Sequence, residues 1–348
     1  MTNINEKLIN LPGYLKSWVT TFNGGLGLFC IIFLIFLPFL STNLSFLKYF
    51  LPHLTLAMIF AIFAASWDLL TGISGQISFG HAIFFGVAGY LCAYLISYQN
   101  YPVWLAILIG TLGATLFGLL IGVPCLRLKG PYLALGTLAF SLILLKLFLQ
   151  GSLAHIFFGS EGISALPKLS KNPIIEYFIV FIFLIISLIV LLQISKSKLG
   201  TIFKSIRDDE TGADASGINT TRYKVLAFMI SSFFAGLAGT FYALYNTAVN
   251  PAGNFGIVIS FFAILMASLG GLTTITGATL GAFFFIFLEY ALIEIGVINI
   301  GAFTFDVGLW KFAIFSIVLI VVVRFADRGI LRPTLERLKD LWDVLLGR

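Results

Sequence analysis

Charge is the scarcest property of this 348-residue sequence. Asp, Glu, Lys and Arg together make up 10% of the residues, whereas 59% are hydrophobic and 37 are phenylalanine. This composition excludes an ordinary soluble domain, and several apolar runs reach the roughly 20 residues that cross a bilayer core. A lipid-exposed backbone can satisfy its amides only in a helix or a closed barrel, and barrel strands would give short alternating segments. We therefore predict an all-α polytopic membrane protein.

Cysteine and histidine are also rare, and this argues against several kinds of site. The cysteines lie in or beside apolar runs without paired spacing, which predicts packing residues with no metal or redox role; they are Cys30, Cys92 and Cys125. The histidines are far apart and form no metal-spaced or triad-like cluster; they are His53, His81 and His155. We therefore expect no metal site, and the sequence argues against an enzyme.

A phosphate-binding loop is missing as well. No Gly-Lys pair occurs anywhere in the chain, so the pattern G-x-x-x-x-G-K-[ST] that cradles nucleotide phosphates is absent. We expect this chain to hold no cofactor, and any energy for work must come from outside it.

Apolar runs bounded by polar, Gly or Pro breaks predict ten membrane spans. They lie near residues 24–42, 50–67, 82–98, 102–122, 131–150, 173–194, 225–246, 256–270, 277–298 and 305–324. The run at 256–270 is short, and stretches rich in Gly, Ser and Thr lie beside it, so a half-helix or a re-entrant turn could replace a full crossing. The exact number of spans stays open at this point.

Basic residues predict the orientation of these spans. With an even number of spans and both termini in the cytoplasm, sixteen of the 21 Lys and Arg residues lie inside. Three lie outside, namely Lys48, Lys168 and Lys171, while Lys146 and Lys311 are near span ends. This asymmetry favours cytoplasmic termini by the positive-inside rule.

Residues 195–224 are the one long charged stretch between two apolar spans, with six basic and four acidic residues. Apolar residues at near-helical spacing predict a single amphipathic helix over 200–216 that lies along the cytoplasmic membrane surface. Gly217 is expected to end it, and Thr220 or Thr221 to cap the next helix. Such a helix could fit a groove on another protein, although a solvated loop that merely fixes topology is an equally good reading of the residues.

A second polar stretch lies between two apolar runs at residues 72–81. Broken backbone at membrane depth is tolerated only where protein or a water-filled cavity surrounds it, so we expect this stretch beside a transport route. Tight helix packing is the alternative role for its glycines. The candidate pathway residues are Gly72, Gly75, Gln76, Ser78, Gly80 and His81.

Small residues four positions apart occur in several of the expected spans. Such pairs let two helices approach closely, which favours ordinary bundle packing. They are Gly118 with Gly122, Ala235 with Gly239, and Gly277 with Gly281.

Two acidic residues within the span expected at 277–298 raise a different possibility. Glu289 lies near its middle, where an ionisable group is a functional candidate, as in a proton-coupled secondary transporter. Glu294 lies at a depth similar to that of Lys311 in the next span, which predicts a structural ion pair. The roles of Glu289 and Glu294 stay open.

Four blocks of the sequence are distinctive and occur in a fixed order. The longest is LGTIFKSIRDDETGADASGINTTRYKVLAFMISSFFAGLAGTFYA at 199–243. The others are WDLLTGISGQISFGHAIFFGVAGY at 67–90, RLKGPYLALGTLAFSLILLKLF at 127–148, and the glycine-rich block at 251–282. Together they resemble inner-membrane permeases of the branched-chain amino acid ABC importers, the LivM-like group. The resemblance covers roughly residues 50 to 325.

The resemblance implies that the helix at 200–217 is a coupling helix that docks on a cytoplasmic ATPase. Its expected coupling residues are Arg207, Asp208, Asp209, Glu210, Ala213 and Gly217. The implied partners are ABC ATPase subunits that bind the ATP, a second permease subunit, a periplasmic or lipid-anchored substrate-binding protein, and membrane lipid. We expect the second permease to be a different chain, although a second copy is left open, and we expect no nucleic acid partner.

The implied protein is a multi-pass importer subunit of the bacterial inner membrane. Residues 24–324 would form the permease domain with the coupling loop at 195–224, between an interfacial N-terminal segment at 1–23 and a cytoplasmic interfacial tail at 325–348. Residues 151–172 form the longest expected external loop, which is either a landing surface for the binding protein or a plain connector. The resemblance supplies branched-chain or related amino acids as substrates, but urea or short-amide importers use permeases of similar pattern.

Overall fold

The computed structural model describes residues 31–39, 45–125, 128, 130–300 and 303–325. The chain divides into two compact units, of which the first contains residues 1–52 and 332–348 and the second residues 53–331. In the first unit, residues 31–39 are helical and helix α4 begins. The expected interfacial segment at 1–23, most of the expected span at 24–42 and all but the first residue of the expected tail at 325–348 lie outside the described residues.

Helices make up nearly all of the described chain. The long helices are α4 (Ser45–Asp68), α5 (Ala82–Ser97), α6 (Val103–Cys125), α7 (Pro131–Leu149), α9 (Pro173–Lys196), α12 (Thr220–Asn246), α14 (Ile257–Gly270), α15 (Ile275–Ile295) and α16 (Val307–Phe325). The short ones are η1 (Leu69–Ile73), η2 (Gly151–Leu153), α8 (Ala154–Phe157), α10 (Lys198–Asp208), α11 (Glu210–Ala215) and α13 (Pro251–Phe255).

Seven helical stretches of the described chain are long and apolar enough to cross a membrane, and α5 is a shorter apolar helix. The prediction of a helical polytopic membrane protein is therefore confirmed. Each expected span between residues 50 and 324 coincides with one of the long helices. Because only part of the expected span at 24–42 is described, the total of ten stays a prediction. The short run at 256–270 becomes a full-length element because α13 precedes α14.

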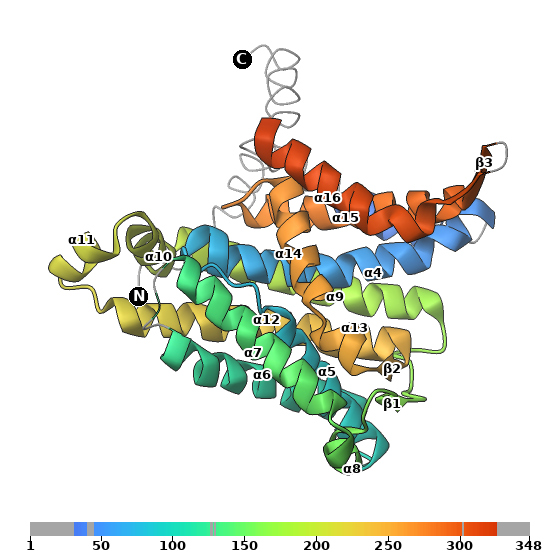
Figure 1. Cartoon of the computed structure of the whole chain (residues 1–348), viewed down its shortest axis with the longest axis horizontal. Helices are drawn as coiled ribbons and strands as arrows, with labels where there is room; N and C mark the ends of the chain where they lie inside the picture. The colour runs from blue at the N-terminus through green and yellow to red at the C-terminus, as the bar shows by residue number, and fades with distance from the viewer. Residues whose placement is uncertain (1–30, 40–44, 126–127, 129, 301–302, 326–348) are drawn as a thin grey trace, which may run out of the picture. The chain divides into compact units, whose positions relative to one another are not determined.

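The second unit is a bundle whose helices run alternately up and down. Figure 1 shows α10 and α11 at one end of this bundle, and α8 with strands β1 and β2 at the other. The break between α4 and α5 and the loop between α14 and α15 lie at the same end as α10. Segments far apart in the sequence therefore meet beside the charged stretch.

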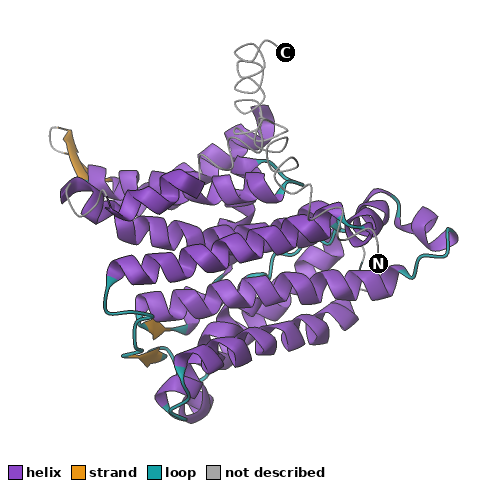
Figure 2. Cartoon of the chain, turned by 180° about the vertical axis from the view of Figure 1, so that it is seen from behind, coloured by secondary structure: helices purple, strands orange, loops and turns teal. Residues whose placement is uncertain are grey.

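Two short antiparallel strand pairs lie within the otherwise helical architecture (Figure 2). Strand β1 (Ile163–Ser164) pairs with β2 (Ala248–Val249), and β3 (Val297–Ile300) pairs with β4 (Phe303–Asp306). The first pair ties the expected external loop to the end of α12. That loop is thus fixed to the bundle by backbone pairing.

Close helix contacts are made at the predicted small-residue pairs. A Cβ at Gly239 of α12 would collide with the carbonyl of Phe85 on α5, and one at Gly281 of α15 would collide with the carbonyl of Met266 on α14. A Cβ at Gly118 of α6 would collide with Ser232 on α12. These glycines bring helix backbones together, as the packing interpretation predicts.

Candidate functional site

The charged stretch folds as two helices instead of the single helix expected over 200–216. Helix α10 ends at Asp208 and α11 begins at Glu210. Between them Asp209 is extended, with φ −153° and ψ 100°, and its side chain accepts a hydrogen bond from the backbone N–H of Thr211 at 3.0 Å. An Asp side chain competes for backbone amides in this way and so starts a new helix.

The ends of these helices are fixed by local side chains. Ser197 caps α10 by accepting from the amides of Leu199 and Gly200. Asn219 caps α12 by accepting from the amide of Arg222 at 2.9 Å, so the prediction of a threonine cap was wrong. Each cap satisfies amides that would otherwise lack a partner.

Gly217 ends α11, as the sequence predicted. Its φ is +84°, in the left-handed region that favours glycine. The amide of Ile218 donates to the carbonyl of Ala213 at 3.1 Å, and that of Gly217 donates to the carbonyl of Asp214 at 2.9 Å. These two bonds form a Schellman motif, which fixes the direction in which the chain leaves the helix.

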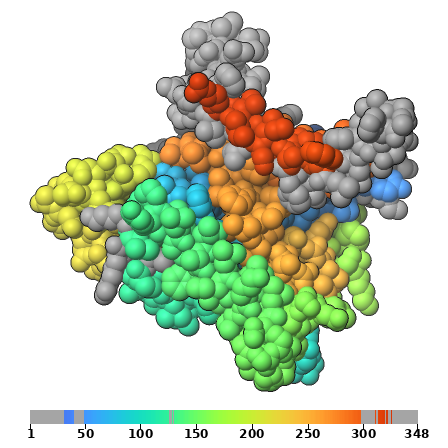
Figure 3. Space-filling view, in the orientation of Figure 1, coloured from blue at the N-terminus to red at the C-terminus, as the bar shows by residue number. Residues whose placement is uncertain are grey.

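The two helices bury one face and expose the other. Phe203, Ile206 and Ala213 are buried, whereas Asp208 and Asp209 are exposed. Figure 3 shows α10 and α11 as a yellow surface at one edge of the bundle. The apolar face thus packs within the protein, not along a membrane surface as expected, and leaves a charged face accessible.

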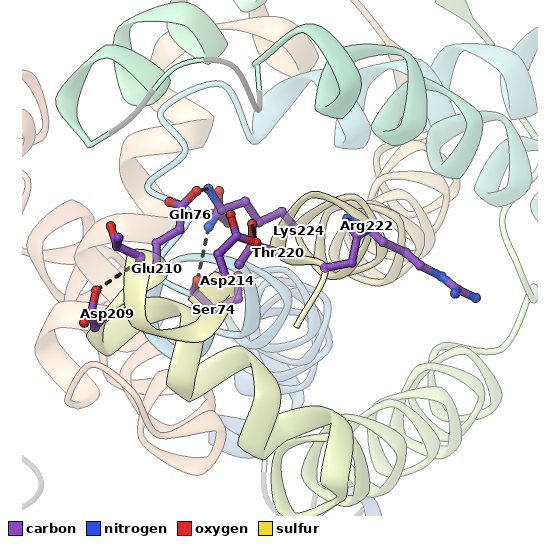
Figure 4. Close-up of polar contacts among 10 residues, drawn as sticks. Ser74, Gln76, Asp209, Glu210, Asp214, Thr220, Arg222 and Lys224 are labelled. Atoms are coloured by element: carbon purple, nitrogen blue, oxygen red, sulfur yellow. Dashed lines mark hydrogen bonds and ion pairs between the residues drawn. The ribbon is translucent and has the colours of Figure 1, made fainter. Parts of the chain in front are cut away.

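Helix α11 is joined to the start of α12 by polar contacts. The ammonium of Lys224 lies 2.5 Å from a carboxylate oxygen of Glu210, and the Lys224 side chain is only 4% exposed. The hydroxyl of Thr220 donates to Asp214 at 3.2 Å. Figure 4 shows these four side chains grouped together, while Arg222 points away. Glu210, expected to face a partner, therefore braces its own protein.

Arg207 joins α10 to the break between α4 and α5. Its Nη1 donates to the carbonyl of Gly72 at 3.0 Å, and its Nη2 lies 2.8 Å from Asp208 Oδ1. Gly75, with φ +74°, lies so close that an added Cβ would stand 2.7 Å from Arg207 Cγ. The two residue sets predicted separately, for coupling and for a pathway, therefore meet at this arginine.

The break itself is a buried, ordered turn. A π-helix, η1, continues α4 to Ile73, and residues 75–80 are irregular. Side chains from other elements satisfy its backbone: Thr137 of α7 accepts from the Phe79 amide at 3.0 Å, and Ser260 of α14 accepts from the Ala82 amide at 2.9 Å. Among the expected pathway residues, Gly72, Gln76, Ser78, Gly80 and His81 are buried.

His81 belongs to a buried polar network that reaches two other helices. Its Nε2 lies 3.0 Å from the hydroxyl of Ser66 on α4, and the hydroxyl of Ser231 on α12 donates to the Ser66 carbonyl at 2.6 Å. The ring packs between Phe63 and Phe84, with centroids 5.1 and 5.4 Å away. These contacts explain how broken backbone is held inside the bundle.

Asp68 and Lys224 make contacts that hold this end of the bundle together, and the sequence did not predict these contacts. Asp68 was not among the predicted site residues, yet its Oδ1 accepts from the Thr273 amide at 2.8 Å, 205 positions away. Lys224 was counted only as one of the six basic residues. A charged residue just inside an apolar run was the available signal, because such a residue must be paired when it is buried.

The acidic residues of α15 are placed differently from one another. Glu289 is partly buried, Glu294 is exposed, and the side chain of Lys311 lies outside the described residues, so the expected ion pair stays a prediction. No three His, Cys, Asp or Glu side chains within the described ranges come close enough together to hold a metal ion.

Comparisons with known proteins agree on one family. A model of the branched-chain amino acid transport system permease component matches residues 49–323. The LivM permease protein of the high-affinity branched-chain amino acid transport system of Escherichia coli K12 is 29% identical over 279 residues, which are 70% of this chain and 65% of that protein. The LivH permease protein of the same strain is 24% identical over 257 residues, 68% of this chain and 83% of that one.

A solved structure also shows some likeness. The structure of PsaBC from Streptococcus pneumoniae in complex with Fab contains a chain that is 16% identical and has a TM-score of 0.44. The match covers 85% of this chain and 96% of that one.

Proposed function

Because this chain belongs to the family of branched-chain amino acid transport system permease components, we propose that it forms part of the membrane pathway of an ABC importer. A separate pair of ATPase subunits supplies the energy. The transported substrate is a branched-chain or related amino acid, and the protein is located in the bacterial inner membrane. Family membership also makes the chain a transport component and not an enzyme.

The observation that carries this proposal is the α10–α11 unit. It exposes a charged face, and its other face is fixed to the bundle by the Arg207 and Glu210 contacts. An ATPase can move membrane helices only through an element that is rigid and firmly attached. Charge-assisted hydrogen bonds are about twice as strong as neutral ones and fix geometry, so they suit this task.

A second, different permease subunit is part of the proposal. The chain is similar to both LivM and LivH of E. coli K12, and both are permease proteins of the high-affinity branched-chain amino acid transport system. Two permease subunits of this kind in one organism support a heteromeric pair. A periplasmic or lipid-anchored binding protein delivers the substrate, and the loop at 151–172 is its proposed landing surface.

A bulky residue on the exposed face of α11 is expected to block ATPase docking. Ala215 is exposed. The contacts that hold α11 to α12 are made by Glu210 and Asp214, so a substitution at Ala215 removes none of them. Ala215→Trp should lower ATP-driven amino acid uptake by about tenfold while leaving membrane insertion unchanged, because the ring would occupy the docking surface. Uptake of labelled leucine and copurification of the ATPase subunits measure the effect.

Ser97→Trp provides the matched control. Ser97 is also exposed but is the last residue of α5, and the neighbouring Tyr98 stacks on Phe158 beside α8, at the opposite end of the bundle. It should keep both the ATPase subunits and uptake near the wild-type level in complexes supplied with saturating binding protein. Full uptake by Ala215→Trp, with the ATPase still bound, would count against the docking assignment.

Replacing Glu289 with Gln is expected to leave uptake dependent on ATP and independent of an imposed proton gradient. The reason is that energy enters through α10 and α11, so no proton relay in α15 is required. Uptake into vesicles with a pH gradient, measured with and without ATP inside, tests this. Uptake that follows the gradient without ATP would support the secondary-transporter alternative.

Competition during uptake distinguishes the substrate classes. Unlabelled leucine, isoleucine and valine should compete with labelled leucine in the complete system, whereas urea and short amides should not. Because the binding protein selects the cargo, the assay must use the binding protein that accompanies this permease.

A further inference from the structure

Arg207 and Asp68 lie on either side of the same short segment, η1. Arg207 of α10 donates to the carbonyl of Gly72 within η1. Asp68, which directly precedes η1, accepts from the amide of Thr273 in the loop between α14 and α15. Three elements far apart in the sequence are thus linked by the side chains of Arg207 and Asp68 at one end of the bundle.

Gly72 is the point where the two contacts meet. A Cβ added there would collide with Asp68 Oδ1 and would lie 2.8 Å from the Thr273 amide nitrogen. Its own carbonyl is the acceptor for Arg207. The packing therefore leaves no room for η1 to shift toward the α14–α15 loop without pushing that loop.

The far end of this connection is held in an unfavourable backbone conformation. Thr273 has φ +69°, which a β-branched residue rarely adopts. Such a conformation persists only where the surroundings enforce it, and it is typical of switch regions. The Asp68 carboxylate is fully buried and bonds to the amide of this residue. The contact thus combines a buried carboxyl group with a strained backbone.

We propose that Arg207 and Asp68 are positioning residues that transmit the displacement of α10 through η1 to the α14–α15 loop. The three elements then move as one body when the ATPase subunits close. Arg207 suits this role because Asp208 also holds its planar guanidinium group in place. The Nε and Nη2 atoms of Arg207 lie 2.9 and 2.8 Å from Asp208 Oδ1. This inference rests on the proposed function and adds the route by which a displacement caused by the ATPase subunits reaches the bundle.

Distances between spin labels in the assembled transporter test the relay directly. The complete complex is reconstituted in nanodiscs, with the native cysteines replaced by alanine and labels placed at exposed pairs. The relay pair is Ser205 on α10 and Leu272 in the α14–α15 loop, and the reference pair is Ser205 and Gln99. Adding ATP and vanadate, which traps ADP with vanadate in the ATPase subunits after hydrolysis, should shift the reference distance and leave the relay distance unchanged.

The variants should separate the two ends of the relay. In Arg207→Ala and Asp68→Ala, trapping should shift the relay distance as well, and ATP hydrolysis stimulated by the binding protein should fall by about tenfold. Asp68→Asn keeps an oxygen that can accept from Thr273 and should restore the wild-type distance. Lys204→Ala removes an exposed charge from the same helix and serves as the control.

Each outcome decides one question. A relay distance that shifts on trapping in the wild-type complex would overturn the relay, and so would variants in which it stays unchanged. If trapping shifts neither distance in the wild-type complex, the proposed function itself fails. If Asp68→Ala does not assemble, the partly exposed Arg207 gives the deciding variant, since its loss leaves no buried charge unpaired on α10.

Discussion

Glu210→Ala is expected to destabilise the protein by about 2 kcal/mol and to abolish most uptake. The substitution leaves the Lys224 ammonium buried without its carboxylate partner, and removing one member of a buried pair costs several kcal/mol. The expected value lies below that range because Glu210 is 32% exposed, so water partly screens the charge that remains. Thermal unfolding of the purified protein in nanodiscs measures the loss.

The double variant Glu210→Ala with Lys224→Met identifies the cause. If the unpaired ammonium causes the loss, removing it should restore most of the unfolding temperature, since an apolar side chain of similar length fits a buried site. Uptake should stay low, because α11 would no longer be braced by an ion pair. Asp214→Ala is the matched control, an exposed carboxylate of the same helix whose removal should cost less than about 1 kcal/mol.

The control and the double variant also separate this explanation from its rival. If α11 were merely a solvated loop, Glu210→Ala and Asp214→Ala would have equally small effects. Equal unfolding temperatures for these two single variants would therefore show that the ion pair does not brace the helix.

Gly281→Leu is expected to cost about 3 kcal/mol and to lower the yield of folded protein sharply. Leucine is a better helix former than glycine, so propensity alone would stabilise α15. Packing opposes it, because the Cβ would collide with the Met266 carbonyl and lie 2.8 Å from the Gly270 amide nitrogen. Backbone atoms cannot move aside as a side chain can, so α14 and α15 must separate.

Gly151→Leu is the control for this substitution. A Cβ at Gly151 meets nothing within 4 Å, and its φ is not among the positive ones. Its unfolding temperature should stay within about 2 °C of the wild type, as expected for a surface change of less than 0.5 kcal/mol. Equal losses for both variants would mean that added bulk, and not the close helix approach, destabilises the protein.

Hydrophobic runs determined most of the fold in advance. Helices α5, α7 and α9 lie within a few residues of the spans predicted for them, because an apolar stretch in a membrane must satisfy its own backbone and so has little choice but to be a helix. Gly217 was also identifiable from the sequence, since a glycine after an amphipathic run is a common helix end.

The tertiary structure alone decided which polar residues meet. The periodicity of residues 200–216 is compatible with one continuous helix, and only the capping geometry of Asp209 divides it. The link from Asp68 to Thr273 spans 205 positions, and that from Arg207 to Gly72 spans 135. Local propensity and hydropathy describe neighbours along the chain, whereas the partner of a buried charge is set by how the helices pack. For this reason the charged stretch could be recognised from the sequence, but its attachment to the bundle could not.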